Sequence, residues 1–343
     1  MIKAIDFFCG AGGLSRGLLD AGINVLAGVD NDERLRMTYE KNNAPSRFIC
    51  QDIKTIDIHQ LRDELAIQQE DIVLYAACTP CQPFSTLNRM KGQDERKHLL
   101  LAFAELLRQA PPDFILVENV PGLNTKYGKE IYEQFAHILN ECEFGEPAAD
   151  FLDAKNFGVP QGRKRFILLA ARHGTISLPH PNPEEKATVK QYLDKYPPLN
   201  DGMHSDAFPN HETRWLPPHL KHIVQAVPKD GGSRRDIEDT SILLKCHQEH
   251  PNVHKDVFGR MAWDKPSPTL TCRCVDVYCG RFIHPEQDRG ISLREAAALQ
   301  TFADDYVFYG TFSHIAKQIG NAVPVKLAKR LGQSVLDAAR ELR

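Results

Sequence analysis

Short apolar segments alternate with segments of helical periodicity up to Ala171, and this alternation constrains the fold more than any other feature of the chain. Segments rich in β-branched and aliphatic residues predict strands at Ile2–Phe8, Asn24–Asp30, Arg47–Cys50, Ile72–Ala77, Phe114–Glu118 and Arg165–Ala171. Between them, the apolar spacing from Leu100 to Leu107 and from Ile131 to Cys142 predicts two helices. Strands that alternate with helices build a parallel sheet covered on both faces. We therefore expect an α/β fold with a mostly parallel sheet.

Beyond His173 the composition changes, because segments such as "LPHPNPEEK" and "KYPPLNDG" are rich in Pro and charge and have few periodic apolar residues. We expect residues 179–291 to form a second, smaller and irregular domain. The chain closes with two helical segments, and in the last one an apolar stripe from Val325 to Leu336 must pack against a surface. The predicted first domain is therefore discontinuous, with residues 1–178 and 314–343, and residues 292–313 are a predicted hinge.

The composition excludes several classes of protein. The chain has 343 residues, which is enough for one large and one smaller globular domain. No apolar run approaches the ~18 residues that span a membrane, so we expect a cytoplasmic protein without a membrane partner. Nine cysteines without the dense spacing of a secreted scaffold indicate reduced thiols. The net charge of −3 does not indicate a nucleic-acid binder, but residues 155–173 hold basic and no acidic side chains, which suits either a phosphate-binding or a solvated surface.

The segment "DFFCGAGGLSRGL" follows the first predicted strand and opens a helix, so its glycines permit a tight turn and close approach of a ligand to the backbone. Ser15 stands where the pattern G-x-G-x-x-G requires its third glycine, which disfavours a pyrophosphate cofactor. Asp30 ends the second predicted strand and Asp52 follows the third, at positions that suit a ribose and an adenine. Each acid alone also fits a helix cap. Together, three converging strand ends indicate a nucleoside cofactor.

The segment "CTPCQPFS" leaves the fourth predicted strand and contains two cysteines three positions apart. A redox pair normally lies at a helix N-terminus, whereas Pro80 and Pro83 make this segment an irregular loop. A zinc site needs a second pair at suitable spacing, which "TCRCVDVYC" does not supply well. We therefore interpret Cys78 as a small buried residue that ends the strand and Cys81 as a nucleophile.

Polar residues also end the last two predicted strands of this part of the chain. In "ILVENVPGL", Glu118 lies at the carboxyl end of its strand, where a carboxyl group can donate a hydrogen bond or act as a general acid, or can simply bond loop amides. In "NFGVPQGRKRFILLA", Arg163 and Arg165 share one side as a strand begins. Two guanidinium groups there suit a nucleobase carbonyl or a phosphate, or an edge strand that carries charges.

The order of "DFFCGAGGLSRGL", "TPCQPFS", "ENVPGL", "QGRKR", "SLREAAALQTF" and "IGNAVPV" resembles that of the DNA (cytosine-5)-methyltransferase family, of the bacterial restriction-modification type. The resemblance covers nearly the whole chain. It implies a Rossmann-like S-adenosylmethionine-dependent methyltransferase fold, with a mostly parallel seven-stranded sheet and a target-recognition domain at residues 179–291. It implies S-adenosylmethionine as cofactor and no metal. The implied cofactor-binding residues are Phe8, Gly10, Gly12, Gly13, Asp30, Asn31, Asp52, Ile53, Pro80 and Asn321.

By the same resemblance, Cys81 attacks C6 of a flipped-out cytosine, and C5 then accepts the methyl group. Glu118 holds or protonates N3, and Arg163 and Arg165 orient the ring and support Glu118. The expected partner is double-stranded DNA. The implied DNA contacts are Ser85, Arg234, Arg235, Arg260, Thr269 and Arg273. We expect a monomer, and a restriction endonuclease that acts on the same DNA site without forming a stable complex.

Two other functions remain open from the sequence. A branch of the family methylates tRNA with the same catalytic motifs, but it carries a Cys-Phe-Thr element where this chain has "TCRC". A nucleic-acid-binding protein that has lost catalysis is expected to lack at least one of the catalytic residues, and all are present. DNA cytosine C5 methylation is the function that the sequence favours.

Overall fold

The structure is a computed structural model that describes residues 1–79, 98–119, 128–182 and 184–341. The chain divides into two compact units. The first contains Met1–Phe157, Lys164–Asn182 and Val323–Arg343, and the second contains Gly158–Arg163 and Pro183–Ala322. In the described residues, no helix combines the length and the hydropathy that a membrane span requires.

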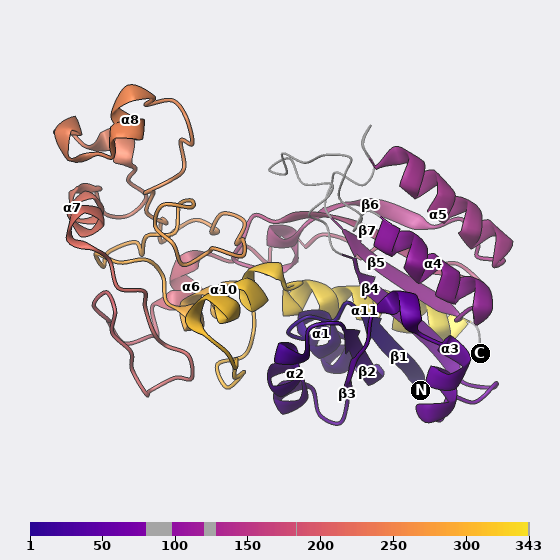
Figure 1. The fold of residues 1–343 in the computed structure, drawn as a ribbon. Helices are drawn as coiled ribbons and strands as arrows, with labels where there is room; N and C mark the ends of the chain where they lie inside the picture. Colours follow the sequence, from indigo (N-terminus) through magenta and orange to yellow (C-terminus); the bar gives the residue numbers. More distant parts are fainter. Residues whose placement is uncertain (80–97, 120–127, 183, 342–343) are drawn as a thin grey trace. The chain divides into compact units, whose positions relative to one another are not determined.

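A seven-stranded sheet forms the centre of the first unit (Figure 1). Its strand order is β3-β2-β1-β4-β5-β7-β6, and only β7 runs antiparallel to its neighbours. The strands are β1 (Ile2–Phe7), β2 (Asn24–Asp30), β3 (Arg47–Cys50), β4 (Ile72–Cys78), β5 (Phe114–Asn119), β6 (Ala148–Asp153) and β7 (Lys164–Ala171). The predicted mostly parallel α/β sheet is confirmed. The sequence did not reveal β6, an edge strand whose three middle residues are exposed and which therefore lacks an apolar run.

Helices cover both faces of this sheet. The helices of the first unit are α1 (Gly13–Ala21), α2 (Arg36–Asn43), α3 (Ile58–Glu64), α4 (Leu99–Gln109), α5 (Lys129–Glu141) and α11 (Val325–Glu341). Apolar side chains of α3, α4 and α5, such as Ile58, Phe103 and Phe135, pack with Phe7 and Tyr75 in one buried cluster. Figure 1 shows α11 on the face of the sheet away from α4 and α5.

The last helix packs closely against the first. α11 lies along α1, as its apolar stripe predicted. Gly17 makes this approach feasible, because a Cβ at that position would overlap the Cβ of Ala328 and lie 2.6 Å from the carbonyl oxygen of Val325. The end of the chain is therefore part of the same folded unit as its beginning.

The sheet brings the ends of its strands to one edge. β1 to β5 are parallel, so their carboxyl ends meet at the same edge, which is where ligands bind in open α/β sheets. β7 runs in the opposite direction, and Phe166 pairs with Asn119 at the end of β5. The first residues of β7 therefore lie at the edge where β5 ends, and this topology brings Arg165 to Glu118.

The second unit has little regular structure. Its helices are α6 (Val189–Leu193), α7 (Pro218–Ala226), α8 (Lys245–Glu249), α9 (Leu293–Leu299) and α10 (Phe312–Asn321). Short 3-10 turns of the two units are at Glu33–Leu35, Ile53–Thr55, Ala154–Phe157, Arg234–Asp236 and Thr240–Ile242. The predicted hinge, residues 292–313, falls inside the second unit, as do residues 314–322. The physical reason is the burial of α9, whose seven residues are all inaccessible.

Candidate functional site

The turn after β1 has the backbone that a close ligand approach requires. Gly10 and Gly12 have φ values of 55° and 88°, and Gly12 precedes α1 in the left-handed conformation. Phe8 also has a positive φ, 59°. Side chains at the two glycines would be strained. Apart from Gly10 and its two chain neighbours, no atom of the described residues lies within 4 Å of the place a Cβ on Gly10 would take, so there is open space beside this turn.

Asp30 connects this turn to the end of β2. Its Oδ2 accepts a hydrogen bond from the backbone N–H of Gly10 at 3.0 Å, and its Oδ1 accepts one from the N–H of Asp32 at 3.1 Å. Burial raises the pKa of Asp30, although these hydrogen bonds oppose the shift. The carboxylate is half-buried and held by backbone groups on both sides, so its position is fixed by the fold.

The predicted residues after β2 and β3 lie at the same edge. Asp30 pairs with Cys50 in the ladder, and Asp52 follows two residues later. Asp52 is exposed, and its Oδ1 accepts a hydrogen bond from the N–H of Lys54 at 3.0 Å, so it caps the short turn that begins with buried Ile53. Asn31 is exposed. The cap that the sequence allowed as an alternative is therefore present.

A buried polar chain beneath the turn was not predicted. Ser15 Oγ donates to Asp6 Oδ2 at 2.6 Å and lies 2.7 Å from Tyr39 Oη, which is 2.8 Å from Ser46 Oγ. Asp6 and Ser15 are fully buried. A carboxylate inside an otherwise apolar strand was the signal for this network. It also explains why Ser15 replaces the third glycine of the dinucleotide pattern, because its hydroxyl connects β1, α1 and α2.

Glu118 and Arg165 form a buried ion pair at the end of β5. Arg165 Nε lies 3.0 Å from Glu118 Oε1, and the two side chains are 12% and 9% exposed. The next residue, Asn119, is fully buried and donates from Nδ2 to Thr79 Oγ1 at 2.6 Å, which connects the ends of β5 and β4. The arrangement supplies a carboxylate whose orientation is set by a guanidinium group.

Arg163 lies in the second unit and has different contacts. It precedes β7, is 2% exposed, and its Nη1 donates to the carbonyl oxygens of Leu270 at 3.0 Å and Gly320 at 3.2 Å. Thr269 is half-buried, and its hydroxyl donates to the carbonyl oxygen of Gly162 at 2.5 Å. The two arginines of "QGRKR" therefore belong to different local structures.

Other predicted site residues lie outside the described part of the chain or differ in burial from the expectation. Pro80, Cys81 and Ser85 lie outside the residues that the structure describes. Cys78, the last residue of β4, is only half-buried, so the sequence overestimated its burial. Asn321 is the last residue of α10 and is exposed.

Two of the four arginines predicted to contact DNA need correction. Arg260 is fully buried and donates to the carbonyl oxygens of Val224, Val227, His284 and Gln287 and to Asp288. Arg234 is 1% exposed and donates to the carbonyl oxygens of Val253 and His254. Both guanidinium groups hold loops of the second unit together and do not present a surface to DNA. Arg235 and Arg273 are exposed.

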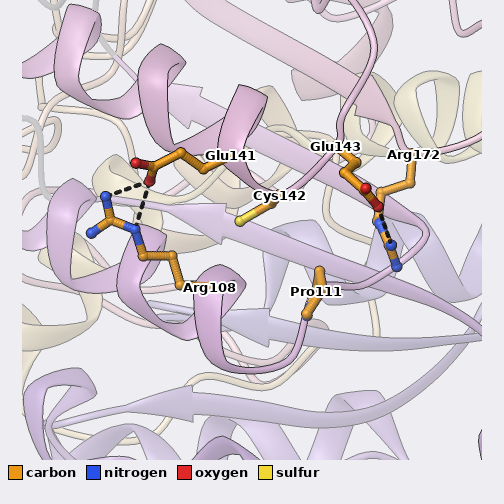
Figure 2. Close-up of a pocket in the computed structure, with 6 residues that line it drawn as sticks. All are labelled: Arg108, Pro111, Glu141, Cys142, Glu143 and Arg172. Carbon is orange, nitrogen blue, oxygen red and sulfur yellow. Dashed lines mark hydrogen bonds and ion pairs between the residues drawn. The ribbon is translucent and has the colours of Figure 1, made fainter.

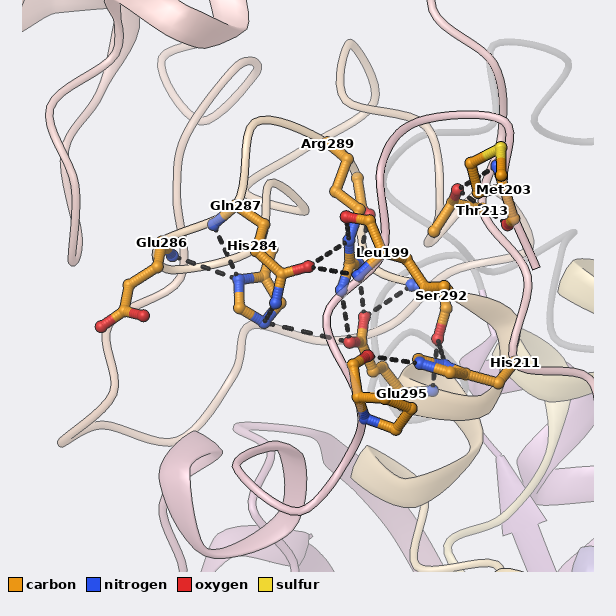
Figure 3. A network of polar contacts seen from close by, with 12 residues as sticks. Leu199, Met203, His211, Thr213, His284, Glu286, Gln287, Arg289, Ser292 and Glu295 are labelled. Atoms are coloured by element: carbon orange, nitrogen blue, oxygen red, sulfur yellow. Dashed lines mark hydrogen bonds and ion pairs between the residues drawn. The ribbon is translucent and has the colours of Figure 1, made fainter. Parts of the chain in front are cut away.

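A second buried ion pair organises the segment before α9 (Figure 3). Arg289 donates to both carboxylate oxygens of Glu295 at 2.8 and 2.7 Å, and Glu295 accepts from the N–H of Ser292 at 2.7 Å. His211 lies 3.0 Å from the Ser292 hydroxyl. Burial lowers the pKa of nearby His284 to about 4, so this imidazole is neutral near pH 7. These groups belong to the second unit and connect the segment before α9 to that helix.

One cavity of the first unit lies away from Glu118. It has a volume of about 340 Å³ and is lined by Arg108, Glu141, Cys142 and Arg172 (Figure 2). It lies beside the start of β5 and the end of β7, which is the sheet edge opposite to Glu118. Its arginines are paired with Glu141 and Glu143. In the basic run at residues 155–173, Arg163 is buried and Arg165 and Arg172 are ion-paired, so the run is not one continuous exposed surface. Among the described residues, no His, Cys, Asp and Glu group suits a metal ion.

Comparison with known proteins gives a consistent result. A family model for C-5 cytosine-specific DNA methylases matches residues 2–337. The chain is 37% identical to the Type II methylase M.HgiDII of Herpetosiphon aurantiacus, with 96% of this chain and 94% of that protein covered. It is 33% identical to the Type II methyltransferase M1.HphI of Haemophilus parahaemolyticus, with 97% and 86% covered. The fold is similar to that of the methyltransferase EhMeth of Entamoeba histolytica, with a TM-score of 0.66, 18% identity and 100% and 99% coverage.

Proposed function

Because the chain belongs to the C-5 cytosine-specific DNA methylase family, we propose that it transfers a methyl group from S-adenosylmethionine to C5 of a flipped-out cytosine in a specific duplex DNA sequence. The observation that carries this proposal is that the Gly10 turn with Asp30 and the Glu118–Arg165 pair lie at the same edge of the sheet. The Gly10 turn with Asp30 suits a nucleoside cofactor. The Glu118–Arg165 pair suits the ring nitrogen of a base in which charge develops during the reaction.

The residues present fit S-adenosylmethionine. The open space above Gly10 and the half-buried carboxylate of Asp30 would receive the methionine part and the ribose, and Phe8, Gly12 and Gly13 form the rest of the turn. The remaining proposed contacts are Asn31, Asp52, Ile53, Pro80 and Asn321. When bound, the cofactor supplies an electrophilic methyl group. No metal is required by this chemistry.

The residues of the chain have distinct proposed roles in the reaction. Cys81, as thiolate, forms a bond to C6 of the cytosine, and C5 becomes nucleophilic. Glu118 contacts N3 and stabilises the charge that enters the ring, while Arg165 holds Glu118 in place. After methylation, loss of the C5 proton and of the thiolate restores the aromatic base.

Base flipping follows from the position of these groups. A cytosine stacked in a duplex cannot reach a carboxylate that is 9% exposed, so the base must leave the helix. The cost is a few kcal/mol, and contacts to the extruded base and to the opened duplex compensate for it. Arg163 is proposed to orient the ring through O2, in addition to its bonds with Leu270 and Gly320.

The second unit is proposed to recognise the DNA. Residues 179–291 correspond to the target-recognition region, where Arg235, Thr269 and Arg273 are candidate contacts, with Ser85 from the first unit. The two relatives are named as a Type II methylase and a Type II methyltransferase, and these names favour DNA over tRNA as the substrate. The same names support a role as the modification enzyme of a restriction-modification system, and we expect a cytoplasmic monomer with a separate endonuclease.

The deciding experiment measures transfer of labelled methyl groups from S-adenosylmethionine to unmethylated genomic DNA, with bulk tRNA in parallel. Cytosine-resolved sequencing of the DNA product then identifies the modified position. We expect label at C5 within one recurring sequence, its loss in Cys81→Ser, and its retention in Cys78→Ser. Label only in tRNA would overturn the DNA assignment, and equal inactivity of the two folded cysteine variants would overturn the role of Cys81.

A further inference from the structure

Two arginines of the second unit share one buried carboxylate. Asp276 is 4% exposed, and its Oδ2 accepts a hydrogen bond from Arg273 Nε at 2.9 Å. Its Oδ1 lies 2.8 Å from Arg214 Nε in a second ion pair. Arg214 and Arg273 are 59 positions apart in the sequence, so the fold brings them together. The shared carboxylate is inaccessible and serves only to anchor the two guanidinium groups.

Each guanidinium group is also held by an aromatic ring and a hydroxyl. Arg273 lies 5.0 Å from the ring centroid of Tyr278 and donates from Nη2 to the Tyr278 hydroxyl at 2.9 Å. Arg214 lies 5.0 Å from the ring centroid of Phe312 and donates from Nη2 to the Ser313 hydroxyl at 2.9 Å. Such contacts reduce the rotamer freedom that an arginine loses when it binds a ligand.

The pair nevertheless remains accessible to a ligand. The side chains of Arg273 and Arg214 are 54% and 34% exposed. Within the part of the chain that the structure describes, Nη1 of neither group has a hydrogen-bond partner. Two positive charges against one carboxylate leave a net positive site on a chain whose formal charge is −3.

We propose that Arg214 and Arg273 form a binding site for one phosphodiester group of the DNA backbone. The inference rests on the proposed function, because it takes duplex DNA as the substrate. Recognition of guanine by arginine uses two adjacent N–H groups in one plane. In Arg273, Nε and Nη2 already donate to Asp276 and to the Tyr278 hydroxyl. In Arg214, Nε is ion-paired with Asp276 and Nη2 donates to the Ser313 hydroxyl. Single contacts from the Nη1 groups of two arginines that share one carboxylate suit the oxygens of a phosphate. The site therefore fixes the position of the duplex and does not read its sequence.

The test compares Arg214→Ala and Arg273→Ala with Arg340→Ala, which removes the same charge from an exposed ion pair on α11. We measure binding of the intact enzyme to a duplex that contains its methylation site and to a duplex that lacks this site. Both are measured at several salt concentrations. We expect each of the first two variants to bind both duplexes roughly tenfold more weakly. The slope of log affinity against log salt should fall by about one, and Arg340→Ala should match the wild type.

The Asp276→Asn variant tests whether the position of the two guanidinium groups matters for DNA binding, or only their charge. The substitution raises the net charge of the site by one unit, so a purely electrostatic patch would bind DNA more tightly. We expect weaker binding, because the two guanidinium groups lose their common anchor. Loss of discrimination between the duplexes in the arginine variants, or behaviour equal to that of Arg340→Ala, would overturn the phosphate site. If the wild-type enzyme neither bound nor methylated DNA, the proposed function itself would fail.

Discussion

The backbone N–H of Gly10 donates a hydrogen bond to Asp30 Oδ2 at 3.0 Å, which joins the glycine turn after β1 to the end of β2. The carboxylate that is proposed to bind the ribose therefore also fixes the backbone around the rest of the cofactor. Removing the charge of Asp30 should therefore weaken both the hydrogen bond to Gly10 and the proposed contact with the ribose.

Asp30→Asn is expected to weaken binding of S-adenosylmethionine by about tenfold to a hundredfold, because a charge-assisted hydrogen bond is lost. Isothermal titration calorimetry of the wild type and the variant measures the change. Asp32→Asn is the matched control, since Asp32 caps the adjacent turn and pairs with Arg34. Similar affinities for both variants would contradict a direct role of Asp30.

Substitutions of Glu118 and of Arg165 should distinguish the residue that is proposed to act on the base from the residue that holds it in position. Glu118→Gln is expected to lower kcat by roughly two to four orders of magnitude, because it removes the carboxyl group that is proposed to exchange a proton with the base. Arg165→Lys keeps the charge but loses the planar geometry at 3.0 Å from Glu118, so we expect a smaller loss of about tenfold. Single-turnover methylation rates at saturating DNA measure both. An Arg165→Lys enzyme slower than Glu118→Gln would indicate that Arg165 contacts the base itself.

Asp6 should make stability depend on pH. Burial raises the pKa of Asp6 to about 7, although the hydrogen bond from Ser15 lowers it. Between the ordinary value near 4 and about 7, the unfolded chain loses this proton while the folded protein keeps it. The stability of the wild type therefore falls as pH rises through this window and levels off above it.

Asp6→Asn removes this titration. We expect the difference in unfolding free energy between pH 5 and pH 8 to shrink by about 3 kcal/mol relative to the wild type. Urea denaturation at the two pH values gives the comparison. An unchanged difference would show that Asp6 ionises normally in the folded protein.

Glu295→Gln should destabilise the second unit strongly. Burial would raise the pKa of Glu295, but the ion pair with Arg289 prevails and lowers it to about 2. This contribution to stability is present above the unfolded pKa and is lost as pH falls towards 2. The substitution leaves the guanidinium group of Arg289 buried without its partner, which costs about 3–5 kcal/mol.

Thermal unfolding of Glu295→Gln, beside Asp337→Asn, tests this expectation. The exposed pair between Asp337 and Arg340 is worth less than about 1 kcal/mol. The melting temperature should therefore fall clearly only in Glu295→Gln. Equal melting temperatures would mean that the buried pair does not contribute to stability.

The sequence predicted the parts of the fold that depend on local pattern. All six predicted strands agree with the structure within one residue at each end. The sequence also placed Asp30 at the end of its strand, although it left open whether the carboxylate binds a ligand or caps a turn.

Long-range hydrogen bonds set the limit of prediction. Nothing near Arg260 in the sequence shows that its guanidinium group is satisfied by carbonyl oxygens of Val224 and His284. The same is true of Arg234. Composition treats a buried arginine and an exposed one alike, so two of the four arginines predicted to contact DNA turned out to be buried in the second unit.

The contact of α11 with α1 can form only late in synthesis. The surface of α1 around Gly17 is covered by a helix that begins at Val325, after the whole second unit has been made. During translation of those roughly 140 residues, the strands of the first unit are present without this cover. The surface of α1 that contacts α11 therefore stays uncovered until the residues after the second unit have been synthesised.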